Sequence, residues 1–344
     1  MAASTQPPTI IIDNGTAFLK AGLSGFHKIP RLFKRKLWDN TIRSLKLDPI
    51  EHPILLTENE LNTTKDREAM AEIMFEEFNT PGLYIEDEAA LSLRWYGRST
   101  GVVVDCGDCF SSVVLFENGR RLPESTILTF GGRDVTRRLM SCLAKSGYTQ
   151  FTSPADETAE AARKIKEEHG YVSNDYCQEV DLVFDRDPSQ VHCEEFPRQV
   201  IYIRHELFSC AEGLFQPKLF EKPQDGIVHA TFRAVESQAI PRQIELLKSV
   251  LLCGGSTLFP TFLERFWGDL LKLQKIEAIK DVKVLAKKNR EYSAWLGANA
   301  LACTDTFHDK LLVSKCRYIE EGMFVFEKKK TTASLFDFST GLAK

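Results

Sequence analysis

The sequence predicts an α/β protein made of two related lobes. A strand–turn–strand unit occurs twice in the chain, and helices follow each copy at the spacing expected for packed α/β layers. The chain has 344 residues, of which 43% are hydrophobic, so it is long enough to bury the cores of two domains.

The repeated unit is a buried strand followed by a turn of the form Asp-x-Gly and a returning strand. The apolar run at 9–12 leads into the turn at 13–15, and the run at 101–104 leads into the turn at 105–107. Glycine and asparagine in such turns favour a tight hairpin. Two copies about ninety residues apart indicate two homologous domains that face one another.

Helices are predicted at 64–78, 133–145 and 241–252 from their apolar periodicity. Thr64 is a candidate cap for the first of these, and Pro81 follows its end. A further helix is predicted at 156–170, where the sequence is charged and rich in alanine, so we expect this helix at the surface. The stretch at 185–197 is polar and contains two prolines, so we expect a surface loop. The tail at 331–344 has too little apolar content to bury, and we expect it to be disordered.

Composition excludes several classes of function. The formal net charge is −4, so no strongly basic surface invites nucleic acid. No apolar run approaches the length of a membrane span. Nine cysteines without a pairing pattern fit a reducing compartment, the cytoplasm or the nucleus. Cys106 and Cys109 form a single C-x-x-C without the second pair that a zinc site needs, so we interpret them as ordinary thiols.

Several motifs occur in an order that resembles the actin and actin-related protein family, nearly from end to end. Residues 13–22 resemble the first phosphate loop of that family, and residues 104–108 resemble the second. Residues 254–260 resemble its adenosine turn. Sugar kinases and Hsp70 relatives share the phosphate loops, so the remaining motifs carry the specificity. These are Glu51-His52-Pro53, Leu55-Leu56-Thr57-Glu58, Gly132-Arg133-Asp134, Ile165-Lys166-Glu167, Leu214-Phe215-Gln216-Pro217 and Tyr292-Ser293-Ala294-Trp295-Leu296-Gly297.

The resemblance implies the actin fold, two duplicated RNase-H-like lobes around a nucleotide cleft. The first lobe would comprise residues 1–95 and 290–330, and the second residues 96–289, with 131–221 as its outer subdomain. The implied cofactor is ATP or ADP with Mg²⁺. Lys20 would supply a positive charge for the β- and γ-phosphate oxygens. Asp13 and Asp105, one in each lobe, would hold Mg²⁺ through water. The complete implied cofactor set is Asp13, Gly15, Thr16, Lys20, Asp105, Gly107, Asp108, Lys166, Glu167, Gly254, Gly255, Ser256 and Phe259.

The chain departs from the family pattern first at the segment between Arg31 and Trp38. Roughly fifty residues, the size of a minimal domain, are missing there. In actin this block forms the small subdomain whose loop inserts into the next subunit. A filament needs two complementary faces for head-to-tail growth, so we expect this chain not to form a filament by itself.

The second departure affects hydrolysis. The catalytic glutamine of the family falls on Glu88, and its catalytic histidine falls on Ser112. Because hydrolysis depends on positioning water and stabilising charge, we expect slow or absent turnover. Glu88 acting as a general base is the alternative. The third departure lies in the groove between the lower lobes, where Arg94 and Arg120 fall on tyrosines of the family and Lys310 falls on a methionine. Either these cations reject the apolar helix ligands that such a groove binds, or they extend over its rim.

The sequence therefore predicts a divergent actin-related protein that binds nucleotide and serves as a structural subunit of a cytoskeletal assembly in the cytoplasm. Its expected partner is actin or another actin-related protein, and one specific form of this role is a cap on the pointed end of an actin-like filament. Neither nucleic acid nor membrane is an expected partner. The alternatives are a nuclear, chromatin-associated actin-related subunit and an ATPase or kinase on the same fold.

Overall fold

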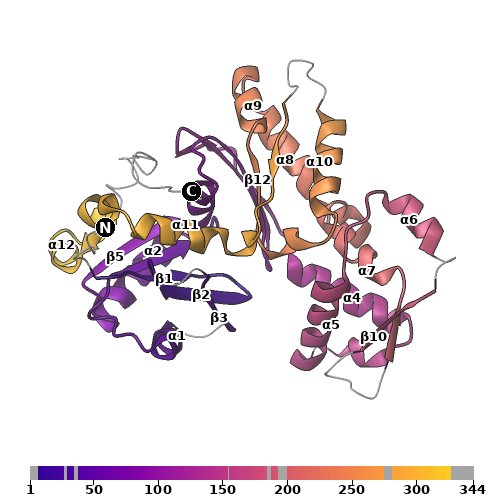
Figure 1. Ribbon diagram of the computed structural model, residues 1–344, viewed down its shortest axis with the longest axis horizontal. Helices are drawn as coiled ribbons and strands as arrows, with labels where there is room; N and C mark the ends of the chain where they lie inside the picture. Colours follow the sequence, from indigo (N-terminus) through magenta and orange to yellow (C-terminus); the bar gives the residue numbers. More distant parts are fainter. Residues whose placement is uncertain are drawn as a thin grey trace. The chain divides into compact units, whose positions relative to one another are not determined.

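The computed structural model describes residues 7–26, 29–34, 38–153, 155–183, 187–192, 200–274 and 281–326. The chain forms two compact units. Unit 1 contains residues 1–103, 114–123 and 287–344, and unit 2 contains residues 104–113 and 124–286. Both units consist of a sheet covered by helices (Figure 1).

Unit 1 is built on a mixed six-stranded sheet. Its central strands β1, β4 and β5 run parallel, whereas β2, β3 and β14 are antiparallel to their neighbours. In spatial order the strands are β14 (Val313–Ser314), β5 (Gly82–Asp87), β4 (Ile54–Glu58), β1 (Ile10–Asp13), β2 (Phe18–Leu23) and β3 (Arg31–Lys34).

Alternating side chains of these strands fill two cores, one on each face of the sheet. Ile10 and Ile12 lie in the first core, and Ile11 lies in the second. Helices α1 (Trp38–Leu45) and α2 (Thr64–Glu72) contribute to the first core. Helices α3 (Glu88–Trp95) and α11 (Ser293–Ala302) contribute to the second. Helices α1 and α11 accordingly lie on opposite sides of β1 and β2 (Figure 1).

The start of α2 differs from the sequence prediction by one residue. The N-cap is Thr63 rather than Thr64, because the Thr63 hydroxyl accepts from the Asp66 N–H while the Asp66 carboxylate accepts from the Thr63 N–H. This capping box has an acidic residue three positions after the cap. The helix continues as a π-helical turn at Ile73–Glu77, where Met74 and Phe75 are fully buried.

The second large sheet has the strand order β13-β12-β6-β7-β8, and β9 also pairs with β7. The boundary between the two units passes through β6 and β7. The pairing of β12 with β13 is parallel and that of β7 with β8 is antiparallel, so this sheet is also mixed. The strands are β6 (Gly101–Cys106), β7 (Ser111–Glu117), β8 (Arg120–Arg121), β9 (Thr126–Leu128), β12 (Val250–Cys253) and β13 (Val284–Leu285).

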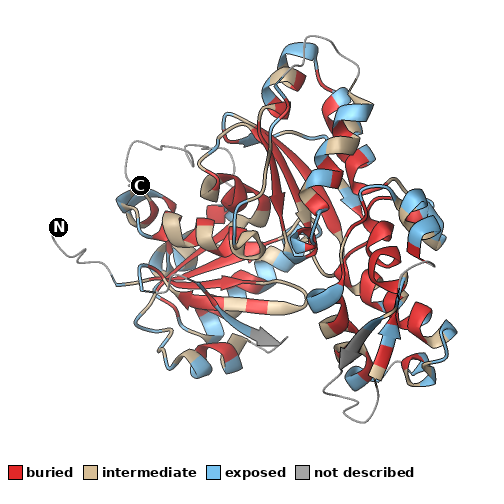
Figure 2. Ribbon diagram, turned by 45° about the vertical axis from the view of Figure 1, so that its right-hand side comes forward, coloured by how far each residue is buried: buried red, intermediate tan, exposed pale blue. Residues whose placement is uncertain are grey.

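Most helices of unit 2 pack with one apolar side inward and leave exposed residues on the other, as the burial colours show (Figure 2). The longer ones have the amphipathic pattern expected of a two-sided helix. The helices are α4 (Gly132–Lys145), α5 (Asp156–His169), α6 (Tyr176–Val183), α7 (Glu206–Ser209), α8 (Ile227–Glu236), α9 (Ile240–Leu247) and α10 (Phe262–Leu273), with 3₁₀ turns at Thr149–Thr152, Ala211–Leu214, Pro217–Phe220 and Gly255–Leu258.

Two sequence predictions for unit 2 were wrong. The stretch expected to be a surface loop contains strand β10 (Ser189–His192), which pairs with β11 (Val200–Ile203). The helix expected at 241–252 ends at Leu247, and β12 begins at Val250. The apolar run at 250–253 is a fully buried strand, and periodicity alone does not separate such a strand from a buried helical segment.

The α/β class is confirmed by these two mixed sheets with their helices, and both repeated units have the predicted strands, β1 with β2 and β6 with β7. The expected disordered tail at 331–344 and the segment 35–37 lie outside the described residues. Cys106 is buried in β6, where burial raises the pKa of its thiol, and Cys109 is exposed. Within the described ranges, no helix has the length and apolar character of a membrane span.

Candidate phosphate-binding loops

The hairpin of β1 and β2 places an acid opposite a base. Asp13 at the end of β1 is in register with Lys20 of β2. Their side chains meet with 2.8 Å between Lys20 Nζ and Asp13 Oδ2, and the Asp13 side chain is only 2% exposed whereas that of Lys20 is 20% exposed. A buried carboxylate needs such a partner, because an unpaired charge inside a protein is costly.

Strand β4 and helix α3 each bring one more polar group to this pair. Thr57 of β4 has its hydroxyl oxygen 3.2 Å from Asp13 Oδ1 and 3.2 Å from Glu88 Oε1. The same oxygen accepts the Asn14 N–H at 3.0 Å. We call the set of Asp13, Lys20, Thr57 and Glu88 the carboxylate cluster. Glu88 is the first residue of α3 and is half-buried.

The turn itself is held by backbone and side-chain contacts. At Gly15, an added Cβ would come within 2.4 Å of the Phe18 carbonyl oxygen, so only glycine fits this close turn. The Asn14 amide donates to the Thr57 carbonyl at 3.1 Å and accepts from the Trp38 indole N–H at 2.8 Å. Thr16 is half-buried in the same turn.

In unit 2 the turn of the second hairpin contacts the start of α4 and the 3₁₀ turn at Gly255–Leu258. The Gly107 carbonyl oxygen accepts from the Gly132 N–H at 2.9 Å and from the Ser256 hydroxyl at 3.2 Å. Gly254 has φ of +84°, and a Cβ there would lie 2.4 Å from Asp105 Oδ1. This positive φ and the close approach both require glycine.

Lys166 of α5 reaches into the same region of unit 2. It is 6% exposed, and its Nζ donates to the Gly132 carbonyl at 3.1 Å. Burial lowers the pKa of this ammonium, and the Glu167 and Asp108 carboxylates partly oppose the effect. Among the described residues, Lys166 Nζ has one hydrogen bond, to a neutral carbonyl, and an anion would stabilise such a buried ammonium.

The other predicted residues of unit 2 have partners of their own. The Asp108 carboxylate accepts from Arg133 at 2.8 and 3.1 Å, and Glu167 pairs with Arg163 at 2.6 Å. Phe259 is buried, and a Cβ added to Gly170 would lie 2.9 Å from the Phe259 ring. A Cβ added to Gly255 would have no neighbouring atom within 4 Å. Ser112 is buried in β7 and offers no imidazole for proton transfer.

The structure thus brings together two subsets of the predicted residues, one in each unit. Asp13, Lys20 and Glu88 meet in unit 1, and Asp105, Gly107, Gly254, Ser256 and Lys166 meet in unit 2. Asn14 and Thr57, which join the first loop to β4, were not predicted as site residues. Gly132 also contacts the site, although its sequence motif pointed only to the family.

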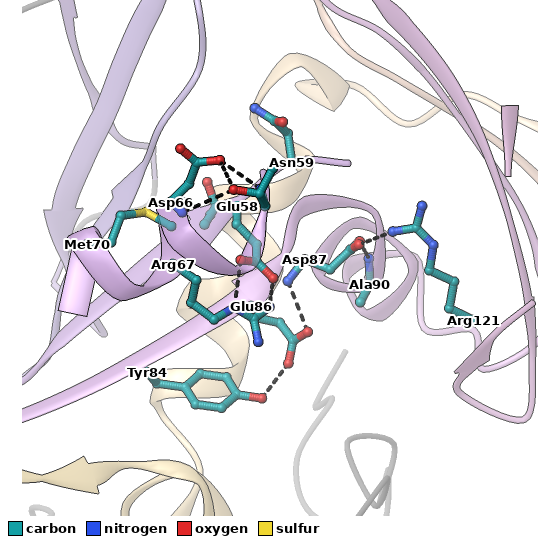
Figure 3. A network of polar contacts seen from close by, with 12 residues as sticks. Glu58, Asn59, Asp66, Arg67, Met70, Tyr84, Glu86, Asp87, Ala90 and Arg121 are labelled. Carbon is teal, nitrogen blue, oxygen red and sulfur yellow. Dashed lines mark hydrogen bonds and ion pairs between the residues drawn. The ribbon is translucent and has the colours of Figure 1, made fainter. Parts of the chain in front are cut away.

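A network of polar side chains surrounds the start of α3 (Figure 3). The Asp87 carboxylate caps this helix by accepting the Ala90 N–H at 2.9 Å, and it accepts from Arg121 at 2.6 Å. The Asp87 N–H donates to Glu86 at 3.0 Å, and the Tyr84 hydroxyl donates to the same carboxylate. Arg67, paired with Glu58, adds a positive charge near Glu86.

Burial shapes the ionisation of this network. It is the main cause that raises the pKa of Glu86 and the pKa of Tyr84, and it lowers the pKa of Arg67. A cavity of about 260 Å³ lies beside the network, and none of the predicted site residues line it. Its lining consists of Glu58, Asn62, Thr63, Thr64, Arg67, Glu68, Met323 and Phe326.

The three cations expected in a polar groove have different environments in unit 1. Arg94 of α3 is half-buried, and desolvation lowers the pKa of its guanidinium. Arg120 of β8 and Lys310, in the π-helical turn Phe307–Leu311, are exposed.

Comparison with protein-family models gives a match to the actin family over residues 32–331. The matched region begins at β3, after the first hairpin, and includes the second hairpin, Lys166 and the turn at 254–260. It covers most of both units, with their two mixed sheets. The chain therefore belongs to the actin family and has its α/β fold.

Proposed function

We propose that this chain is a nucleotide-binding, non-polymerising structural subunit of a cytoskeletal protein assembly. Members of the actin family generally bind ATP or ADP with Mg²⁺. The observation that carries the proposal is the pair of loops, each ending a buried strand in Asp and each accompanied by a lysine, Lys20 in unit 1 and Lys166 in unit 2.

The chemistry of both loops fits a nucleotide with Mg²⁺. Lys20 offers a partly exposed ammonium, and Gly15 and Gly107 lie in tight turns where the backbone N–H groups would be able to approach phosphate oxygens. Lys166 is a buried cation whose Nζ donates to the neutral Gly132 carbonyl. Asp13 and Asp105 would hold Mg²⁺ through water, which suits an ion that retains much of its hydration shell. Bound Mg²⁺ would neutralise phosphate charge, and Ser256 and Phe259 would contact the nucleoside.

Hydrolysis is proposed to be weak. The residue at position 88 is an acid, which shares the Thr57 hydroxyl with Asp13, and buried Ser112 has no imidazole. In-line attack on a γ-phosphate needs an oriented water and compensation for developing charge, and a carboxylate opposes the second requirement. The nucleotide is therefore proposed to be a structural ligand that stabilises the fold.

The absence of self-assembly is supported by the connection after β3. This strand ends at Lys34 and α1 begins at Trp38, so three residues separate them. Such a connection holds no loop that could insert into a neighbouring subunit. The proposed partner is actin or another actin-related protein, and the specific form of the proposal is a terminal subunit at the pointed end of an actin-like filament. Exposed Arg120 and Lys310 favour a partner with acidic residues.

Thermal unfolding with and without nucleotide tests the binding part of this proposal. A ligand that binds only the folded state stabilises it by about 2.7 kcal/mol at one hundred times its Kd. Mg-ADP or Mg-ATP should therefore raise the Tm of the wild type. The double variant Asp13→Ala with Asp105→Ala should lose that increase. A wild-type Tm that does not change at millimolar nucleotide would reject nucleotide binding.

A further inference from the structure

One carboxylate oxygen of Glu291 is buried without a hydrogen-bond partner. Glu291 lies in the 3₁₀ turn Arg290–Tyr292, which leads directly into α11. Among the described residues, no donor forms a hydrogen bond with Glu291 Oε2, and this oxygen is shielded from solvent. Most buried acceptors have a donor, because an unsatisfied one has lost its hydration without compensation. A donor from a ligand would therefore stabilise this oxygen.

The start of α11 lies on the same side of the unit 1 sheet as the side chains of the first loop. Ile11 of β1 belongs to the second core together with Ala294 and Trp295 of α11. Because side chains alternate along a strand, Asp13 and its register partner Lys20 lie on the same side as Ile11. The residues on either side of Lys20 in β2 lie in the first core, on the opposite side, as this alternation requires.

The contacts along α11 also direct its start towards Lys20. Asn299, in the second half of this helix, accepts from the Gly25 N–H at 3.0 Å, just beyond the end of β2. The first half of the helix is thus left for the earlier part of β2, where Lys20 lies. Tyr292 agrees with this placement, because desolvation and Glu291 raise the pKa of its hydroxyl while Lys20 partly lowers it. Glu291 therefore lies beside the first loop, within unit 1.

The chemistry of Glu291 favours an uncharged donor group as its ligand. A carboxylate repels a phosphate, so the phosphates of a ligand at the first loop would not turn towards it. Within the described ranges, no group of three or more His, Cys, Asp or Glu side chains is placed to hold a metal ion. Carboxylates form strong hydrogen bonds with O–H and N–H donors. A nucleotide has such donors in its nucleoside part, namely the ribose hydroxyls and the amino group of the base.

We propose that Glu291 is a specificity-determining residue whose buried oxygen accepts a hydrogen bond from the nucleoside of a nucleotide bound at the first loop. The donor is a ribose hydroxyl or the amino group of the base, which offer the same chemistry to a carboxylate. This proposal rests on the nucleotide binding proposed above and names the part of the ligand that is selected. A ligand without the donor would leave the oxygen unpaired, and a site built in this way rejects such analogues.

The test measures Kd values by isothermal titration in excess Mg²⁺ for ADP and two analogues. The analogue 2′,3′-dideoxy-ADP lacks the ribose hydroxyls, and purine riboside diphosphate lacks the amino group. The wild type should bind one analogue on the order of tenfold more weakly than ADP, and the weakened analogue identifies the donor. Glu291→Met has a similar size but no carboxylate. It should bind ADP on the order of tenfold more weakly than the wild type does and no longer distinguish ADP from that analogue.

Two further variants complete the design. Glu51→Met is the matched control, because it removes an exposed acid at the opposite end of β4 from Thr57 and should leave all three Kd values unchanged. Glu291→Gln keeps the shape of the side chain but loses the charge of the acceptor. It should lose part of the same discrimination, and it replaces Glu291→Met in the test if the methionine variant does not fold.

The outcomes separate this proposal from the one on which it rests. If the wild type does not bind ADP, the proposed function fails and this inference fails with it. If the wild type binds ADP and both analogues with equal Kd values, the role of Glu291 is rejected while nucleotide binding stands. A folded variant at position 291 that keeps the wild-type Kd for ADP and the wild-type discrimination rejects this role as well.

Discussion

The Glu86 carboxyl contacts two neighbours on its own strand β5 and lies near Arg67 of α2. It accepts from the Tyr84 hydroxyl and from the Asp87 N–H, and it lies in the field of Arg67 (Figure 3). Desolvation is the largest cause of its raised pKa and outweighs the two hydrogen bonds that lower it. Glu86 nevertheless keeps some exposure, so the effect should be smaller than for a fully buried carboxyl.

A raised pKa in the folded state has a defined consequence for stability. Between the ordinary pKa of a glutamate and the raised one, the folded chain binds more protons than the unfolded chain, so stability falls as the pH rises through this window. We expect Glu86→Gln, which retains the acceptor oxygen, to remove this loss. Each unit by which folding raises this pKa corresponds to about 1.4 kcal/mol in the free energy of unfolding. Urea unfolding from pH 4.5 upward for both proteins measures the difference.

The difference between the two proteins isolates this carboxyl, since other acidic groups contribute equally to both. Folding lowers the pKa of Asp269, so its contribution to the stability of the protein is lost as the pH falls. This effect has the opposite pH dependence to that of Glu86, and it is the same in both proteins. The wild type should become less stable relative to Glu86→Gln as the pH rises. A constant difference across the window would show that the Glu86 pKa is not raised by folding.

Local sequence patterns found the residues within each hairpin, and the family resemblance supplied Lys166, Gly254 and Ser256 from elsewhere in the chain. Thr57, which joins the first loop from β4, was missed. Asp13, Gly15 and Lys20 lie in one motif, and their meeting follows from a tight antiparallel turn. Thr57 is 44 positions from Asp13 and meets it only because β4 pairs in parallel with β1. Such parallel pairing depends on a long connection that local patterns do not specify. The contact of Glu88 with this group was not predicted for the same reason.

At the scale of elements, the packing of α3 against α11 depends on one glycine. A Cβ on Gly297 would lie 1.9 Å from the Leu91 carbonyl oxygen, and the Ser92 and Ser293 hydroxyls meet at 2.8 Å between the same helices. The two helices therefore approach at backbone contact. This contact fixes α3, and α3 in turn carries Glu88 at its first position.

We expect Gly297→Ala to destabilise unit 1 by about 1–3 kcal/mol, because the helices would have to separate. Alanine is otherwise favoured over glycine in a helix by about 1 kcal/mol, so a net loss shows that packing dominates. Chemical denaturation measures the free energy of unfolding. Gly268→Ala in α10 is the matched control, because its Cβ position has nothing within 4 Å. That variant should gain stability, and a gain at position 297 as well would contradict the close packing.

The elements that the sequence predicted correctly are those with a strong local pattern. Helices α4 and α5 begin and end within a residue of their predicted bounds. The apolar stripe of α4 was visible in the sequence, whereas α5, expected to be a charged surface helix, also buries one side. Strand β10 was missed because it is a short polar strand that depends on pairing with β11. Strand β12 was assigned to a helix because four consecutive buried apolar residues have no visible period.

For the whole molecule, the decisive feature is the short connection between β3 and α1. Actin-type growth is head-to-tail, and each subunit must offer two complementary faces. A specific interface typically buries about 1,600 Å² in total, and a loop inserted into the neighbour would supply a central part of it. Three residues between Lys34 and Trp38 cannot supply such a loop. One face of this chain should therefore be unable to accept another copy.

We expect the purified chain to remain a monomer or a small closed oligomer in the salt and Mg²⁺ concentrations that polymerise actin. Sedimentation velocity and negative-stain microscopy measure this, and conventional actin under the same conditions is the control. Long helical filaments formed by this chain alone would contradict the non-polymerising proposal. Addition to growing actin-like filaments separates the two remaining forms of that proposal. Arrest of growth at the pointed end supports the cap, and unchanged growth at both ends rejects the cap while a role as a non-terminal partner subunit stands.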